Sequence, residues 1–133
     1  MNHPECPPEE NIVRAITSAH WDRKSNRYSS DLFKGARTSV SRLSILPLDE
    51  LFKIFHRQLD RLPDKVVEKA GEINIGCLQE IGKEYFNAPV ELTVVADPTP
   101  ENPAHAEIPQ KISRGLARKI IEALVPHEDI STS

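Results

Sequence analysis

The feature that most constrains the fold of this chain is an apolar stripe that follows Pro47. Proline suits the first turn of a helix, and Asp49 and Glu50 complement the positive end of a helix dipole. Apolar residues then recur every three or four positions until Pro63 ends the pattern. This spacing predicts an amphipathic helix over 47–62 with one buried face. The stripe consists of Leu48, Leu51, Phe52, Phe55, Leu59 and Leu62, and we expect both phenylalanines to be core residues.

The remaining elements are predicted from alternation and from helical spacing. Strands are expected over 11–19, 38–46, 66–76 and 90–96, with a short edge strand over 104–108. A short helix around residues 78–85 and a final helix over 112–124 complete the set. The fourteen residues between Ile75 and Val90 are enough for a parallel βαβ crossover, and an antiparallel arrangement also fits. The predicted fold class is α+β, or α/β, with a small mixed sheet of about four to five strands, two main helices and one short helix.

Length and composition predict a single domain. The 133 residues fit one hydrophobic core, with residues 11–126 as the globular part. Residues 1–10 carry three prolines and three glutamates and are expected to be a disordered lead-in, and 127–133 a flexible tail. The start of the chain is unlike a signal peptide, and no apolar run approaches the roughly 18 residues that span a bilayer. Cys6 and Cys77 form no disulfide or metal motif, so a cytoplasmic protein without a membrane partner is expected.

The net charge of −3 conceals an uneven distribution. The segment from Arg14 to Arg42 contains seven basic and two acidic residues. The segment from Pro109 to Pro126 contains four basic residues and one acidic residue. If the two segments lie side by side, their charge would attract phosphate or nucleic acid. The alternative is that both are ordinary solvated surfaces.

His105 and Glu107 lie between two prolines, just before the last predicted helix. In an extended segment both side chains point to one face, where they could serve general acid–base catalysis or bind a metal. His20 and Asp22 have the same spacing. Two histidines brought together would resemble the acid and base of metal-independent ribonucleases. The other interpretation of His105 is a histidine hydrogen-bonded within a turn, and we assign no residue to a metal.

Arg14 lies inside the first apolar segment, where an unpaired guanidinium is costly to bury. Its fork binds phosphate or carboxylate with two hydrogen bonds, so Arg14 is a candidate anion ligand if it faces a cleft, and otherwise a strand-edge residue. The same two interpretations apply to Arg42, and Ser39 is a candidate hydrogen-bonding neighbour. No GxSxG motif surrounds the serines and the five glycines do not cluster. The sequence therefore predicts neither a nucleophile elbow nor a phosphate-binding loop, and it indicates no particular cofactor.

A longer succession of residues resembles an uncharacterised group of small bacterial hypothetical proteins. It runs from Arg14 and His20 through Phe33 to Thr38-Ser39-Val40, and it closes with the segment 102–108, Asn-Pro-Ala-His-Ala-Glu-Ile. The shared features are an early arginine, a Ser-Val strand and a late His-Ala motif, over about residues 11–125. The resemblance implies a bacterial origin and ranks Arg14 and His105 above other polar residues. It carries no activity that could be transferred.

These patterns predict a polar pocket that acts on or binds a phosphate-containing ligand, a nucleotide or RNA. The candidate catalytic residues are His105, His20 and Glu107, and the candidate ligand-binding residues are Arg14, Arg42 and Ser39. Whether the protein is an enzyme stays open at this point. The alternatives are an open basic face that binds nucleic acid without catalysis, and a non-catalytic protein-interaction subunit of a larger bacterial system.

Overall fold

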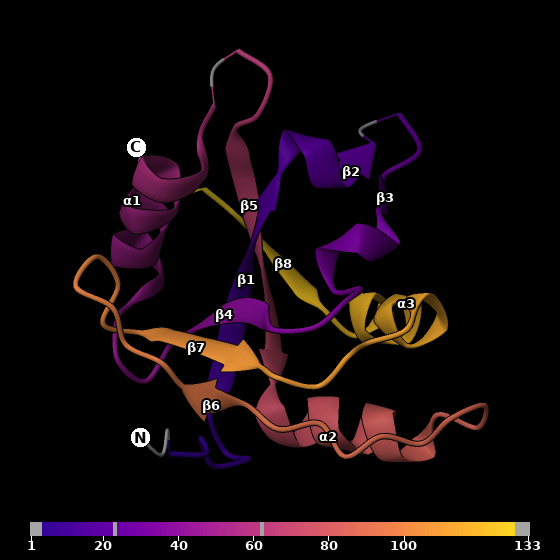
Figure 1. Cartoon of the computed structure of the whole chain (residues 1–133). Coiled ribbons are helices and arrows are strands. Elements are labelled where there is room, and N and C mark those ends of the chain that lie inside the picture. The colour runs from indigo at the N-terminus through magenta and orange to yellow at the C-terminus, as the bar shows by residue number, and fades with distance from the viewer. Residues whose placement is uncertain (1–3, 23, 62, 130–133) are drawn as a thin grey trace.

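The computed structural model describes residues 4–22, 24–61 and 63–129 (Figure 1). In this part of the chain, six antiparallel strands form one sheet in the order β6-β7-β4-β1-β5-β8. Their bounds are β1 Asn11–Thr17, β4 Thr38–Arg42, β5 Val67–Asn74, β6 Val95–Ala96, β7 His105–Ile108 and β8 Val125–Glu128. A separate hairpin pairs β2 Trp21–Asp22 with β3 Arg27–Tyr28. The α+β class is confirmed, and the sheet is larger than predicted.

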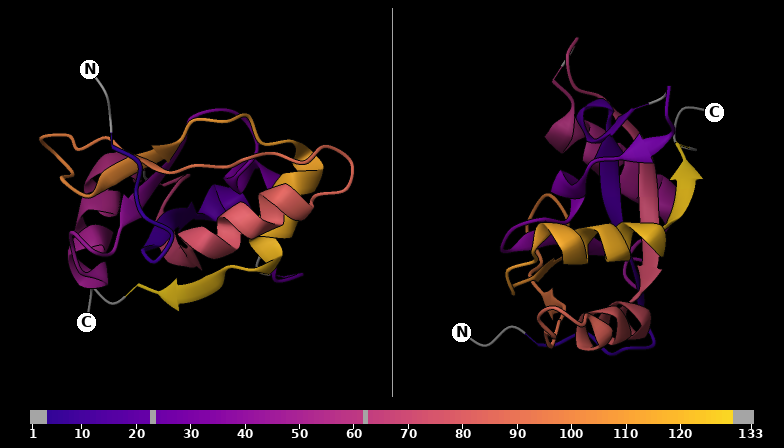
Figure 2. Two further views of the ribbon diagram at one scale, coloured as in Figure 1. Left: turned by 90° about the horizontal axis from the view of Figure 1, so that it is seen from below. Right: turned by 90° about the vertical axis from the view of Figure 1, so that its right-hand side faces the viewer.

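Three helices pack on the two faces of the sheet. They are α1 Leu48–Leu59, α2 Ile75–Glu84 and α3 Arg114–Glu122, and two 3₁₀ turns, η1 Ser18–His20 and η2 Ser30–Leu32, precede β4. Ile12 and Ile16 of β1 join the core formed with α2 and α3, whereas Val13 and Ala15 join the core formed with α1. This alternation follows from the two-residue period of a strand. Figure 2 shows α2 and α3 side by side, on the side of the sheet away from α1.

The apolar stripe after Pro47 forms α1 as predicted. Pro47 is the N-cap residue, and the helix ends at Leu59. Phe52 is fully buried and Phe55 nearly so, with their rings edge to face at a centroid distance of 6.3 Å. Helix α1 therefore covers one face of the sheet with the core residues that the spacing indicated.

The predicted strand over 90–96 is wrong for most of its length, because only Val95 and Ala96 pair in the sheet. The Val90 amide instead donates to the carbonyl of Gly82 in α2, and the Val94 carbonyl accepts from Cys6. A Cβ on Gly82 would lie 2.6 Å from the Val90 carbonyl oxygen, so this close approach requires glycine. The segment is apolar because it packs on α2, not because it continues a strand.

The parallel crossover and the mixed sheet are also corrected. Strand β6 pairs with β7 and not with β5, and every strand pair of the described residues is antiparallel. Strand β7 is not an edge strand, because it lies between β6 and β4. Its central position explains the buried Ala106 and Ile108. Candidate residues on β7 are thereby held on both sides by neighbouring strands.

The described parts of the expected lead-in and tail are ordered against the domain. Cys6 is buried, and the Arg42 guanidinium binds the Glu10 carboxylate with two hydrogen bonds of 2.8 and 3.0 Å. At the other end, 127–128 belong to β8. Residues 1–3 and 130–133 lie outside the described residues. None of the helices in the described residues is both long and apolar enough to cross a bilayer.

His56 links α1 to the C-terminal segment and makes stability depend on pH. Its ring binds Asp60 at 2.7 Å and Asp129 at 2.5 Å. Burial alone would lower the pKa of His56, but the hydrogen bonds to Asp129 and Asp60 outweigh it and raise this pKa above 6.5. A raised folded-state pKa means that the stabilisation is complete below about pH 6.5 and is lost as pH rises through the raised value.

We therefore expect His56→Gln to remove part of the pH dependence of the melting temperature. The difference between the native protein and the variant should be on the order of a few degrees at pH 5.5, because partly exposed ion pairs contribute about 1 kcal/mol or less. It should shrink toward pH 8. Thermal unfolding followed by circular dichroism at several pH values measures it. A difference that grows with pH would contradict this interpretation.

Candidate functional site

A cleft of about 430 Å³ opens where β1 and β4 separate. The register of these strands ends after Ile12↔Arg42 and Val13↔Ser41, whereas β4 continues to pair with β7 as far as Thr38↔Ile108. Where the two strands no longer pair, the Arg14 side chain of β1 makes the hydrogen bonds to the neighbouring backbone. Its Nη1 donates to the Ser39 carbonyl at 2.7 Å, and its Nε donates to the Leu32 carbonyl.

Arg14 is a charged residue in the lining of this cleft without a carboxylate partner among the described residues. Its five N–H donors include three that these two backbone carbonyls do not occupy. Among the described residues no acidic side chain pairs with it, and its other contact is the Phe33 ring at 6.0 Å. Burial lowers the pKa of Arg14 to about 10. The side chain is therefore still cationic at neutral pH and is poorly solvated.

His20 lies on the same cleft, at the end of the turn η1 that follows β1. Its Nδ1 lies 3.1 Å from the Thr17 hydroxyl. Burial lowers the pKa of His20, and the positive charges of Arg14 and Lys65 lower it further. Within the described residues the other ring nitrogen makes no hydrogen bond. His20 is therefore a neutral imidazole at pH 7 that can accept a proton.

His105 projects from β7 into the cleft beside Ser39 of β4. Its Nδ1 lies 2.8 Å from the carbonyl oxygen of Asp97 and 3.3 Å from that residue's carboxylate, and its Nε2 lies 3.2 Å from the Ser39 hydroxyl. Strand register produces this contact, because His105 pairs with Ser41 and the Ser39 side chain lies diagonally across on the same face. The Ser39 side chain is exposed to the cleft.

The loop before β7 holds His105 in a fixed place. Buried Asn102 accepts from the Ala104 amide through Oδ1 and donates to the Ser41 hydroxyl through Nδ2, both at 3.0 Å. The His105 amide donates to the Asn102 carbonyl, and its carbonyl accepts from the Asp97 amide. The proline-rich loop is thus a hydrogen-bonded turn against β4, and it presents the imidazole rather than enclosing it.

The structure brings together four of the six residues that the sequence analysis selected. Arg14, His20, Ser39 and His105 line the cleft. Arg42 does not, because its guanidinium is paired with Glu10. Glu107 lies on the same strand as His105 but is outside the lining and pairs with Arg37 at 3.6 Å. Neither of these two residues contributes to the cleft as predicted.

Several cleft residues were not selected from the sequence. Asp97 lies outside the lining, but its carbonyl group orients the His105 ring. The two residues are eight positions apart, and no sequence motif predicts their contact. Lys65 comes from the loop between α1 and β5. The remaining lining residues are Val13, Ala15, Thr17, Val40, Ser41, Phe55, Gln58, Leu59, Thr99, Glu101 and Asn102. In the described residues no group of three His, Cys, Asp or Glu side chains could hold a metal ion.

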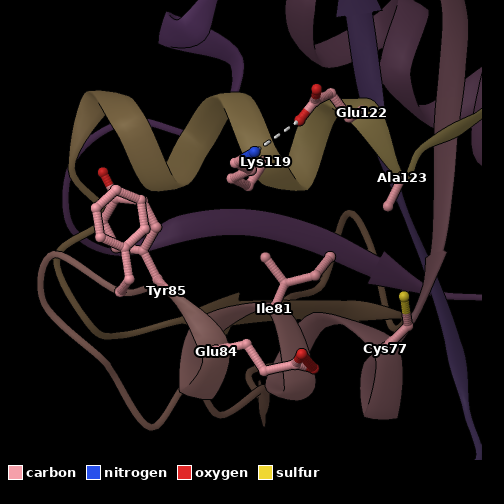
Figure 3. A pocket seen from close by; sticks show the side chains of 8 residues that line it. Cys77, Ile81, Glu84, Tyr85, Lys119, Glu122 and Ala123 are labelled. Atoms are coloured by element: carbon pink, nitrogen blue, oxygen red, sulfur yellow. Dashed lines mark ion pairs between the residues drawn. The ribbon is translucent and has the colours of Figure 1, made fainter.

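A second hollow lies between α2 and α3 and is of a different kind. Figure 3 shows Ile81 of α2 and Tyr85, the residue that follows α2, facing α3, where Lys119 pairs with Glu122 at 3.8 Å. The hollow also includes Phe86, a residue that is 82% exposed. Because two carboxylates, Glu84 and Glu122, accompany the single Lys119, this hollow offers less to an anion than the cleft does.

The two basic segments meet next to this second hollow. Arg27, Arg118 and Lys119 line one depression together with Tyr28 and Tyr85. The segments are therefore neighbours here, on the α3 side, while the cleft lies on the α1 side. Glu122 lines the same depression, so the predicted positive face stays a prediction.

The fold and the cleft define a single-domain α+β protein with a cationic polar cleft. Comparisons with protein-family models, with curated proteins and with solved structures found no match to this chain. The chemistry of the cleft is therefore the basis for the function proposed below.

Proposed function

We propose that the cleft binds a phosphate-containing ligand, a nucleotide or RNA, and that its two imidazoles transfer protons on that ligand. One observation carries the proposal: Arg14 lines the cleft where β1 and β4 separate, is partly buried, and has no carboxylate partner among the described residues. A buried cation without a counter-charge is costly. An anion that binds in the cleft offsets that cost.

The surroundings of Arg14 favour a phosphate over other ligands. Lys65 adds a further donor, and Glu101, an exposed residue, is the one acidic residue in the described lining. A phosphate offers several oxygens to such a set, and the guanidinium fork can bind two of them at once. The cleft volume lies within the range of about 300–1,000 Å³ that small-molecule sites occupy.

The two imidazoles support proton transfer in different ways. His20 is neutral at pH 7 because burial and nearby cations lower its pKa, so it suits a general base. His105 presents Nε2 to the cleft and is oriented through Nδ1. Both side chains line the cleft together with Arg14.

The alternative function, a non-catalytic protein-interaction subunit, draws support from a different place. Phe86 exposes 82% of its area beside the hollow between α2 and α3. A large exposed aromatic side chain is common where proteins associate. A protein-interaction function does not depend on the cleft residues. The experiment below therefore distinguishes it from the proposed action on a phosphate-containing ligand.

We expect His105→Ala to lower turnover of a panel of nucleoside phosphates and short RNAs at least about a hundredfold, the usual effect of losing an acid–base group. The free energy of unfolding should change by about 1 kcal/mol or less, because the side chain lies at the edge of the cleft and not in the core. Turnover and urea unfolding are measured on the same preparations.

His127→Ala is the matched control, since His127 lies on β8 outside the cleft and binds Glu72 at 2.7 Å. It should leave turnover unchanged. If the native protein turned over no member of the panel, or if His105→Ala mainly lowered the melting temperature, the proposed proton-transfer role would be wrong.

A further inference from the structure

We propose that Ser39 is a nucleophile in this cleft, with His105 as its general base and Asp97 as the residue that positions the imidazole. This inference rests on the proposed function, because it takes the bound phosphoester as the substrate. It changes the role of Ser39 from a hydrogen-bonding neighbour to the residue that forms a covalent intermediate.

The hydrogen bonds of His105 fix which ring nitrogen carries the proton. The Asp97 carbonyl has no hydrogen to give, so Nδ1, 2.8 Å away, must be the donor. In the neutral ring Nε2 is then an acceptor, and its partner at 3.2 Å, the Ser39 hydroxyl, must donate. A serine hydroxyl that donates to an oriented imidazole is the arrangement that activates a nucleophile.

The carboxylate of Asp97 adds an electrostatic contribution. It lies 3.3 Å from Nδ1, close enough to stabilise the imidazolium that forms when Ser39 loses its proton. His105 therefore lies within hydrogen-bond distance of the nucleophile Ser39 and within ion-pair distance of the positioning residue Asp97. Ser39 and His105 lie on adjacent, paired strands, and such rigid elements hold a catalytic geometry better than loops do.

Arg14 lies where negative charge would develop. Its Nη1 donates to the carbonyl of Ser39 itself, so the guanidinium is next to the nucleophile's own backbone. A phosphoryl group bound by the remaining N–H donors would thus lie beside the Ser39 hydroxyl. Stabilising the equatorial oxygens in this way is the largest contribution that a protein makes to phosphoryl transfer.

The reaction balances without a further reactant except water. The Ser39 oxygen bonds to phosphorus as the bond to the leaving oxygen breaks, and the serine proton passes through His105 Nε2 to that leaving group. Water then attacks phosphorus and gives a proton to Nε2. The bond between phosphorus and the Ser39 oxygen breaks, and His105 returns the proton to Ser39.

A fluorophosphonate ester tests the proposal without knowledge of the natural substrate. The native protein should gain one adduct on Ser39, with release of fluoride, as located by mass spectrometry. Ser39→Ala should abolish the adduct, and His105→Asn should slow labelling at least about a hundredfold. Asp97→Asn, which keeps the carbonyl, should slow labelling at least about tenfold with an unchanged melting temperature. The control Ser25→Ala, in an exposed turn, should label like the native protein.

The outcomes separate this inference from the proposed function. If no adduct forms on Ser39, or if its rate is unchanged in His105→Asn, the nucleophile is ruled out. Titration of the same variants with inorganic phosphate then decides the rest. If the variants still bind inorganic phosphate, the proposed phosphate site stands without the nucleophile. If the native protein binds no phosphate, both the phosphate site and the nucleophile are wrong.

Discussion

Replacing Arg14 with Met is expected to weaken the binding of inorganic phosphate and adenosine monophosphate at least about thirtyfold. Truncating one partner of a buried, hydrogen-bonded charge pair costs about 2 kcal/mol or more, and each 1.4 kcal/mol is a factor of ten in affinity. Methionine has a similar length but no charge and no donors. Isothermal titration calorimetry at fixed ionic strength measures the change.

Two further variants define what this result means. Arg14→Lys keeps the charge without the planar fork, so its affinity should lie between those of the native protein and Arg14→Met. Arg118→Met removes an exposed arginine of α3, outside the cleft, and should bind like the native protein. Equal losses in Arg14→Met and Arg118→Met would mean that phosphate binds through general surface charge and not in the cleft.

Phe52→Ala is expected to lower the free energy of unfolding by about 3–5 kcal/mol, the cost of truncating a fully buried aromatic side chain. Phe52 is 0% exposed and packs in the core between α1 and the sheet. Its neighbour Phe55 lines the cleft, so the cavity would also loosen one cleft wall. Since small domains have a total stability of about 5–15 kcal/mol, much of the protein would unfold under mild denaturant. Urea unfolding measures the change.

Lys53→Ala is the control for this prediction, because Lys53 follows Phe52 in α1 but is exposed to solvent. It should change stability by about 0.5 kcal/mol or less. A loss below about 1 kcal/mol in Phe52→Ala would contradict the position of α1 on the sheet.

The sequence predicted those elements whose local pattern and tertiary environment agree. The stripe of α1 and the strands β1 and β4 were predicted because burial follows helical or alternating periods there. Residues 90–94 were misassigned because burial against α2 gives the same apolar composition as a strand, while the hydrogen bonds go to Gly82 and Cys6. The order of the strands in the sheet could not be predicted from the sequence either, because pairing between distant segments leaves no local pattern.

The candidate site was predicted in part for a similar reason. Arg14 was identified because a charged residue in an apolar strand needs a special environment, and His105 because of its position in a proline-rich turn. Glu107 was included on spacing alone, although the structure pairs it with Arg37. The contact between Ser39 and His105 depends on the register of β4 and β7, which neither segment encodes by itself.

The most direct test of the phosphate site is an NMR titration of the imidazole resonances with inorganic phosphate and with adenosine monophosphate. His20 and His105 line the cleft, whereas His56 and His127 do not. The proposal predicts saturable shifts of His20 and His105, with a rise in the pKa of His20 as the bound anion compensates the nearby positive charges. Unshifted resonances of His20 and His105, or shifts of the same size in all four histidines, would contradict a phosphate site in the cleft.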